Sequence, residues 1–291
     1  PVGIDYQHYQ KYYQNLLIIF GEPVNVSEFM ADYSESQAKG LNSLKDRVSD
    51  EMKKVMIHIE NDELYDMYQD LRYIWNKRMR RMLGIRGEKL ADKFQADKYM
   101  IEILNFKYES DPDSLRDLAL KTSNYINNLK SLNMRNWVIE RRGYSIFKFL
   151  YICIILVLFS PIAFYGYINN WLPFNIPVIK TKKIKDKQFH SSFKFVFSLL
   201  MFPGFYIIQS IMVGILTGSA SIAWLYFFSL PVTGYIALYW SIYFKKVRSV
   251  FYFKKRIVKK DPLLKRTLTL YSEILEIMQA ICKDYLNKIS M

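Results

Sequence analysis

Residues 195–244 read FVFSLLMFPGFYIIQSIMVGILTGSASIAWLYFFSLPVTGYIALYWSIYF, a run without a charged residue or a histidine. One membrane-spanning helix needs about 20 apolar residues, so the run fits two helices joined by the turn TGSAS at 217–221. We predict helices at 195–216 and 222–244, with kinks at Pro203 and Pro231. A buried hairpin in a soluble protein is the alternative interpretation of this run.

A second uncharged run, at 149–179, is interrupted by Pro161, Gly166, Pro173 and Pro177. Basic residues flank it on both sides, with Arg141, Arg142 and Lys148 before it and Lys180, Lys182, Lys183, Lys185 and Lys187 after it. Because Lys and Arg mark the cytoplasmic ends of membrane segments, both ends of the run are expected in the cytoplasm. This favours a re-entrant or in-plane element at about 147–178, followed by one hairpin at 195–244. A single span at 147–168 is the alternative, and it would place one basic cluster outside.

Charge divides the chain into two parts. Residues 1–142 carry 22 basic and 22 acidic side chains, whereas residues 143–291 carry 19 basic and 5 acidic ones. The excess therefore borders the apolar runs, where Lys and Arg attract anionic phospholipid headgroups. Nucleic acid is not an expected partner, because that would require basic residues on a soluble face with aromatic residues among them. We expect a multi-pass integral membrane protein whose soluble part lies on the cytoplasmic face of the bilayer.

The part before the membrane region is predicted to be soluble and mostly helical. Residues 1–7 and 15–23 are apolar enough for two short strands, with Gly21 in a turn. Ser34 and Gln37 form the pattern of a capping box, before an apolar stripe that ends at Val55 and is expected to be a helix-packing face. A second helix is predicted at 62–82, with Leu64, Met67, Leu71 and Ile74 on one apolar stripe. The pairs Asp111-Pro112 and Asp261-Pro262 each combine an N-cap residue with proline in the first turn, and the second pair opens an amphipathic helix that ends near Asn287.

The sequence contains no recognisable catalytic or metal-binding set. The three histidines, His8, His58 and His190, have no partner at metal-ligand spacing. Cys153 and Cys282 fit neither a disulfide framework nor a zinc site, which favours a reducing compartment. The segment GIRGEK at 84–89 lacks the spacing of a phosphate-binding loop and is interpreted as a surface turn. We predict no metal site and no bound cofactor.

The opening of the chain resembles the end of a glycerolipid acyltransferase domain. Pro1-Val2-Gly3-Ile4 is similar to the fourth conserved block of the glycerol-3-phosphate and 1-acylglycerol-3-phosphate acyltransferases, and Gly21-Glu22-Pro23 is similar to the turn that follows it. The resemblance implies that Pro1, Val2, Gly3 and Ile4 contribute to substrate binding in the parent protein. It also implies acyl-CoA or acyl-carrier protein as the co-substrate of that parent.

The same resemblance suggests a division of the chain. Residues 1–25 would end an α/β acyltransferase domain, and 26–142 would form a soluble helical region. Residues 143–260 would form the membrane region, and 261–291 a C-terminal amphipathic helix. The expected fold class is therefore mainly α and integral to the membrane, with a short β remnant at the N-terminus.

The family's catalytic motif is absent from this sequence. In that motif, His-x4-Asp, the histidine acts as a general base and the aspartate orients it. Tyr13 stands five positions after His8, Phe195 stands five after His190, and His58 is followed at that distance by Glu63. No Glu-Gly block is present either. We therefore predict no catalytic residue in this chain and expect it to begin downstream of the active site, with the missing N-terminal catalytic domain as its partner.

Two functions follow as hypotheses. In the first, the chain is the membrane-anchoring C-terminal portion of a phospholipid-biosynthesis enzyme. Its parent would move a fatty acyl group to glycerol 3-phosphate or a lysophospholipid. In the second, the chain is a stand-alone, non-catalytic membrane scaffold or transport component. The absence of an ionisable residue from 195–244 disfavours transport, because ion and solute pathways usually contain one.

Overall fold

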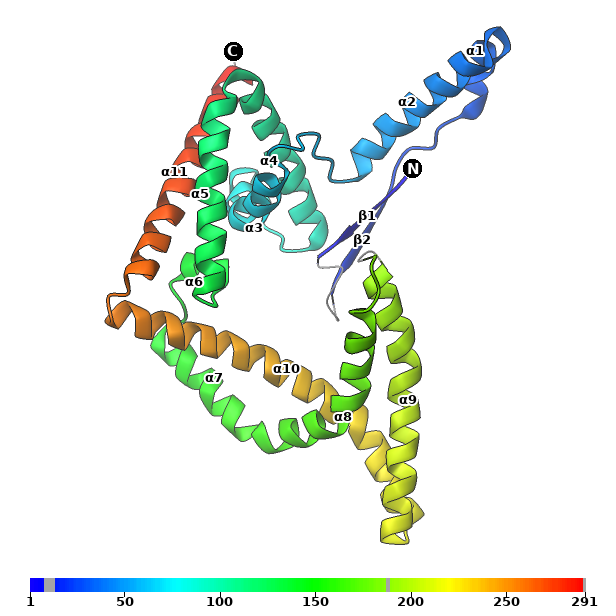
Figure 1. Cartoon of the computed structure of the whole chain (residues 1–291), viewed down its shortest axis with the longest axis vertical. Coiled ribbons are helices and arrows are strands. Elements are labelled where there is room, and N and C mark those ends of the chain that lie inside the picture. The colour runs from blue at the N-terminus through cyan, green and yellow to red at the C-terminus, as the bar shows by residue number, and fades with distance from the viewer. Residues whose placement is uncertain (8–13, 187–188, 290–291) are drawn as a thin grey trace. The chain divides into compact units, whose positions relative to one another are not determined.

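The computed structural model describes residues 1–7, 14–186 and 189–289, and its secondary structure is mostly helical. The described residues divide into two compact units (Figure 1). The first combines the residues before 133 with the C-terminal segment from Pro262, and the second comprises 133–261. His8 lies outside the described residues.

The first unit starts with a two-stranded antiparallel sheet. Strand β1 (Val2–Tyr6) pairs with β2 (Leu16–Phe20), so that Val2 lies opposite Phe20 and Ile4 opposite Ile18. Both strands fall within their predicted ranges. A 3-10 helix (Val26–Phe29) and the short helix α1 (Met30–Glu35) then lead to α2.

Helix α2 (Gln37–Val55) corrects two sequence-based expectations. The predicted capping box does not form, because Ser34 lies inside α1 and its hydroxyl donates to the carbonyl of Met30. The apolar stripe is not a packed face within this unit either. Leu41 is 58% exposed and Val48 is 40% exposed, whereas Val55 at the end of the stripe is buried.

Four helices form the core of the first unit: α3 (Tyr65–Met82), α4 (Leu90–Ser110), α5 (Pro112–Ser131) and α11 (Pro262–Ile289). The Asp111 carboxylate accepts a hydrogen bond from the backbone N–H of Ser114, which confirms the predicted cap of α5. Helix α11 lies alongside α5 (Figure 1) and also contacts α4. Its predicted stripe is largely buried, including Met278 and Cys282. The C-terminal helix therefore completes the core formed by the earlier helices.

The second unit contains α6 (Asn136–Arg141), α7 (Ile146–Leu158), α8 (Ser160–Thr181), α9 (His190–Thr217) and α10 (Ala220–Val258). Helices α9 and α10 form the predicted hairpin around Gly218, whose φ of 63° is readily adopted by glycine. Both helices are long and apolar enough to cross a membrane. Helix α10 extends 14 residues beyond the predicted end at Phe244.

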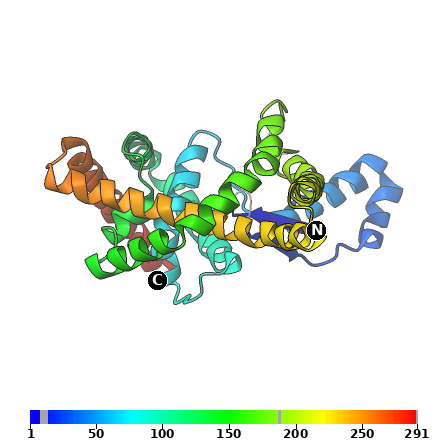
Figure 2. The same ribbon diagram turned by 90° about the horizontal axis from the view of Figure 1, so that it is seen from below.

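Helices α7 and α8 occupy the second apolar run and meet at a bend of 59°. Helix α8 crosses α10 (Figure 2). The expectation that all the glycine and proline positions break this run was wrong, because α8 continues through Gly166, Pro173 and Pro177. The break lies just before Pro161.

Candidate functional site

The residues of the predicted substrate-binding block lie on or next to β1. The carbonyl of Pro1 accepts a hydrogen bond of 2.9 Å from the backbone N–H of Gly21, which closes the sheet beside the Gly-Glu-Pro turn. Gly3 is buried against the end of α2, where a Cβ atom would lie 1.7 Å from the carbonyl oxygen of Val55. Gly3 therefore has a packing role, since only glycine permits this close approach.

One face of the two-stranded sheet is apolar and open. Six side chains on this face are at least 44% exposed: Val2, Ile4, Tyr6, Leu16, Ile18 and Phe20. Their pairing places them opposite one another in three rows. We call this set the open sheet face. An isolated two-stranded hairpin is at best marginally stable in water, so this face is suited to be covered by further structure.

The opposite face of the sheet is tied to the helices through ionic contacts. Arg72 of α3 donates from Nε to the Asp97 carboxylate at 3.0 Å, and its Nη2 lies 3.8 Å from Asp5 of β1. Asn76 donates a second hydrogen bond, of 2.6 Å, to Asp97. Burial raises the pKa of Asp97, and the Arg72 guanidinium opposes this effect. Arg72 of α3 thus links α4 to β1, the strand that contains most of the predicted substrate-binding block.

The structure does not join His58 and Glu63 into a general-base pair. The Nε2 atom of His58 lies 3.3 Å from the carboxylate of Glu60. Glu63 accepts two hydrogen bonds from the guanidinium of Arg116, at 2.7 and 3.2 Å. His190, the other histidine among the described residues, has its Nε2 2.9 Å from the backbone carbonyl oxygen of Ile184. Among the described residues, no group of three or more His, Cys, Asp or Glu is placed to hold a metal ion.

The second unit contains a polar cluster that the sequence analysis missed. Asn170 of α8 is 8% exposed and donates through Nδ2 to the carbonyls of Gly166 at 2.9 Å and Leu230 at 3.3 Å. Its Oδ1 accepts a hydrogen bond of 2.6 Å from the hydroxyl of Tyr206. A single amide thereby connects α8 with both helices of the hairpin.

The neighbouring amide, Asn169, makes a second set of connections. The Gln209 side chain of α9 donates to the backbone carbonyl of Asn169 at 3.0 Å, and the Tyr226 hydroxyl of α10 donates to the side-chain Oδ1 of Asn169 at 2.7 Å. The Tyr165 and Ser229 hydroxyls are 3.0 Å apart. The sequence contained one signal for this cluster, the pair Asn169-Asn170 inside an apolar run. Their partners could not be found from sequence, because they lie 36 to 60 positions away.

Close backbone approach makes these hydrogen bonds possible. A Cβ atom at Gly166 would lie 2.1 Å from the carbonyl oxygen of Thr233, and one at Gly234 would lie 2.8 Å from the Asn170 amide. Small residues at such crossings let helices approach, and polar side chains then bond across them. The polar cluster is therefore arranged to fix α8 against the hairpin.

The positions of these contacts show how far α7 and α8 extend along the hairpin. Tyr206 and Leu230 each lie 11 residues from the turn residues Thr217 and Ser219, which corresponds to about 16 Å of helix. Helix α7 instead packs near the far end of α10, where Ile152 and Leu156 form a buried cluster with Val247. The end of α8 leads back to the start of α9. Together α7 and α8 reach the middle of the hairpin and return to its basic end.

The bend between α7 and α8 has an identifiable cause. Pro161 lacks a backbone N–H and cannot continue the hydrogen-bond pattern of α7. The carbonyl of Val157 accepts from the Ser160 hydroxyl at 2.8 Å, and that of Leu156 accepts from the Trp240 indole at 2.7 Å. These side chains donate to carbonyls in the last turn of α7, where the regular helix pattern ends.

Comparison with protein-family models, curated proteins and solved structures gave no match.

Proposed function

We propose that this chain is the membrane-anchoring C-terminal portion of a phospholipid-biosynthesis acyltransferase. The parent enzyme transfers a fatty acyl group from acyl-CoA or acyl-carrier protein to glycerol 3-phosphate or a lysophospholipid. The observation that carries the proposal is the open sheet face beside the block Pro1-Val2-Gly3-Ile4. An exposed apolar sheet face indicates a surface that other structure covers, and a preceding catalytic domain is the proposed cover.

In this proposal the hairpin α9–α10 spans the bilayer. Large apolar side chains are exposed along both helices, as at Leu216, 81% exposed, and Leu225, 73% exposed. Such exposure is unfavourable in water and suits contact with lipid. At 39 residues, α10 is about 58 Å long, longer than a hydrocarbon core of about 30 Å. Its segment beyond Phe244, rich in Lys and Arg, then extends into the cytoplasm.

Helices α7 and α8 form a re-entrant element in the same proposal. Their path to the middle of the hairpin and back supports this arrangement over a single span at 147–168. Buried amides at that depth need hydrogen-bond partners because the hydrocarbon core contains no water. The polar cluster supplies them. The soluble first unit then lies on the cytoplasmic side, where the parent's active site meets lipid.

The scaffold or transport alternative rests on the same polar cluster, viewed as a solute site. Asn, Gln, Ser and Tyr side chains make up the cluster, without an ionisable group of the kind that ion pathways use. The hydrogen bonds that join Asn170 to Leu230, Tyr206 to Asn170 and Tyr226 to Asn169 each connect one helix to another. These contacts favour a packing role for the polar cluster over a solute-binding role. They therefore favour the membrane-anchor function over transport.

The gene and its full product provide the test. The reading frame upstream of the codon for Pro1 is expected to encode His-x4-Asp and a Glu-Gly block within about one domain length. The full product should transfer acyl groups to glycerol 3-phosphate or a lysophospholipid, and the 1–291 polypeptide alone should not. The proposal would be contradicted by an upstream reading frame that lacks these motifs. It would also be contradicted if the 1–291 polypeptide had acyltransferase activity that His58→Ala abolished.

A further inference from the structure

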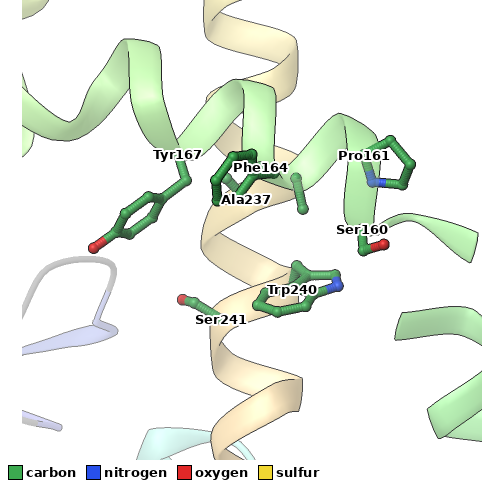
Figure 3. A pocket seen from close by; sticks show the side chains of 8 residues that line it. Ser160, Pro161, Phe164, Tyr167, Ala237, Trp240 and Ser241 are labelled. Carbon is green, nitrogen blue, oxygen red and sulfur yellow. The ribbon is translucent and has the colours of Figure 1, made fainter. Parts of the chain in front are cut away.

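A pocket of about 580 Å³ lies between α8 and α10 next to the α7–α8 bend. Ser160, Pro161, Phe164 and Tyr167 line it from α8, and Ala237, Trp240 and Ser241 line it from α10. Figure 3 shows the Trp240 side chain extending from α10 toward the end of α8 that carries Ser160 and Pro161. We call this pocket the bend groove.

The wall of the bend groove is mainly apolar. Its hydroxyl groups are largely engaged elsewhere, since Ser160 donates to Val157 and Ser241 donates to the carbonyl of Leu238. Phe164 is 67% exposed and Tyr167 is 54% exposed, so the groove opens to the surface of the helices. In the proposed membrane arrangement, lipid is the medium at this opening.

A lysine stands one helical turn beyond the groove. Lys245 follows Ser241 by four positions, about 6 Å along α10, and therefore lies on the same face. Helical side chains lean toward the N-terminus of their helix, which directs Lys245 back toward the groove. The sequence has no Asp or Glu between 195 and 260. The neighbouring Lys246 instead lies over the Tyr243 ring, 4.9 Å from its centre.

We propose that the bend groove holds an acyl chain of a phosphate-bearing lipid whose phosphate is bound by Lys245. The inference rests on the proposed insertion of α8–α10 in a bilayer, and it is independent of acyl transfer by the parent. The apolar wall accommodates the chain, and the lysine at its basic end neutralises the phosphate. Occupancy requires both parts, which distinguishes the groove from the general attraction of anionic lipid to the basic segments.

Photo-cross-linking of the full chain in phosphatidylcholine vesicles tests this inference. The probe is phosphatidylglycerol with a photoreactive group in one acyl chain, and the same modification on phosphatidylcholine is the comparison. In the wild type, peptides from 160–167 and 237–241 should be labelled more strongly by the phosphatidylglycerol probe. Lys245→Gln should lower that labelling about fivefold, the effect of one lysine near a membrane surface.

Three controls complete the experiment. Lys255→Gln makes the same charge change away from the groove and should leave groove labelling unchanged. Ser241→Phe fills the groove and should reduce labelling by both probes. Inorganic phosphate added in excess should not compete, and competition would assign Lys245 to a soluble phosphate. Competition by inorganic phosphate would overturn the proposal. So would equal labelling along all exposed turns, cross-links to a second copy of the chain, or unchanged labelling in Lys245→Gln.

Discussion

The indole Nε1 of Trp240 in α10 donates a hydrogen bond of 2.7 Å to the backbone carbonyl of Leu156, near the end of α7. The contact joins two residues 84 positions apart and provides a partner for a carbonyl freed by the helix break. In an apolar environment, an unpaired carbonyl is costly. The bend before Pro161 is therefore stabilised by a residue that belongs to the hairpin.

Replacing this tryptophan should loosen the bend. Trp240→Phe keeps an aromatic ring but removes the donor, and the cost of leaving Leu156 unpaired is about 1–3 kcal/mol. The free energy of unfolding in mixed micelles, followed by circular dichroism, measures the loss. Trp171→Phe is the matched control, because that side chain is 45% exposed on α8. Equal losses in the two variants would contradict the role given to the indole N–H.

The crossing of α8 and α10 should tolerate no side chain at Gly166. Gly166→Ala places a methyl group against the Thr233 carbonyl and should destabilise the helix packing by about 1–3 kcal/mol. Gly204→Ala in α9 is the control, because a Cβ atom there has no neighbour within 4 Å. It should be neutral or slightly stabilising, since alanine favours helix. Stability of Gly166→Ala equal to that of Gly204→Ala would show that this close approach is wrong.

Removing the arginine that faces Asp97 should produce a pH-dependent defect. Arg72→Met leaves a buried carboxylate without its cation, at a cost of about 3 kcal/mol near neutral pH. Because burial raises the folded-state pKa of Asp97, and the loss of Arg72 raises it further, lowering the pH toward that value protonates the carboxylate and relieves the cost. The defect should therefore be smaller near pH 5 than near pH 7.5.

Hydrogen exchange of peptides from α3 and α4 reports this defect within the first unit. The exposed Arg81 on the same helix provides the control variant Arg81→Met, which removes one positive charge without uncovering a buried acid. A defect of Arg72→Met that is independent of pH, or larger at low pH, would exclude this account of Asp97.

The basic segment after Phe244 should contribute to substrate capture by the parent enzyme. Substituting Lys254, Lys255, Lys259 and Lys260 with Gln should leave membrane insertion intact, because Lys245, Lys246 and Arg248 remain. In the full gene product, the change should raise the apparent KM for the anionic substrate at low salt. At physiological salt, charge attraction is screened over about 8 Å, so the difference should shrink as salt rises. Identical kinetics at every salt concentration would limit these lysines to a role in topology.

Local signals in the sequence were sufficient for several elements. The Asp111 cap of α5, the stripe from Leu64 to Ile74 and the turn at Gly218 each depend on residues within a few positions, and the structure confirms them. The length of α10 was underestimated because the prediction stopped at the first lysine, although helix formation does not require an apolar sequence. Prolines 173 and 177 do not end α8, since proline is tolerated inside helices where neighbours re-satisfy the backbone.

The remaining features depend on contacts distant in sequence. Asn170 meets Tyr206 and Leu230, and Asp97 meets Arg72, only after the helices pack. No local pattern specifies such partners. The open sheet face and the exposed stripe of α2 likewise required the structure, because a periodic apolar pattern predicts an apolar face without indicating whether other residues cover it.

Cysteine labelling from each side of the membrane tests the central claim most directly. In a background with Cys153→Ala and Cys282→Ala, single cysteines would replace Ala220 at the hairpin turn, Lys185 after α8 and Lys259 after α10. The re-entrant arrangement predicts that an impermeant reagent reaches position 220 only from outside and positions 185 and 259 only from the cytoplasmic side. Labelling of position 185 from outside would contradict it and favour a span at 147–168, and labelling of all three positions from one side would contradict a membrane-spanning hairpin.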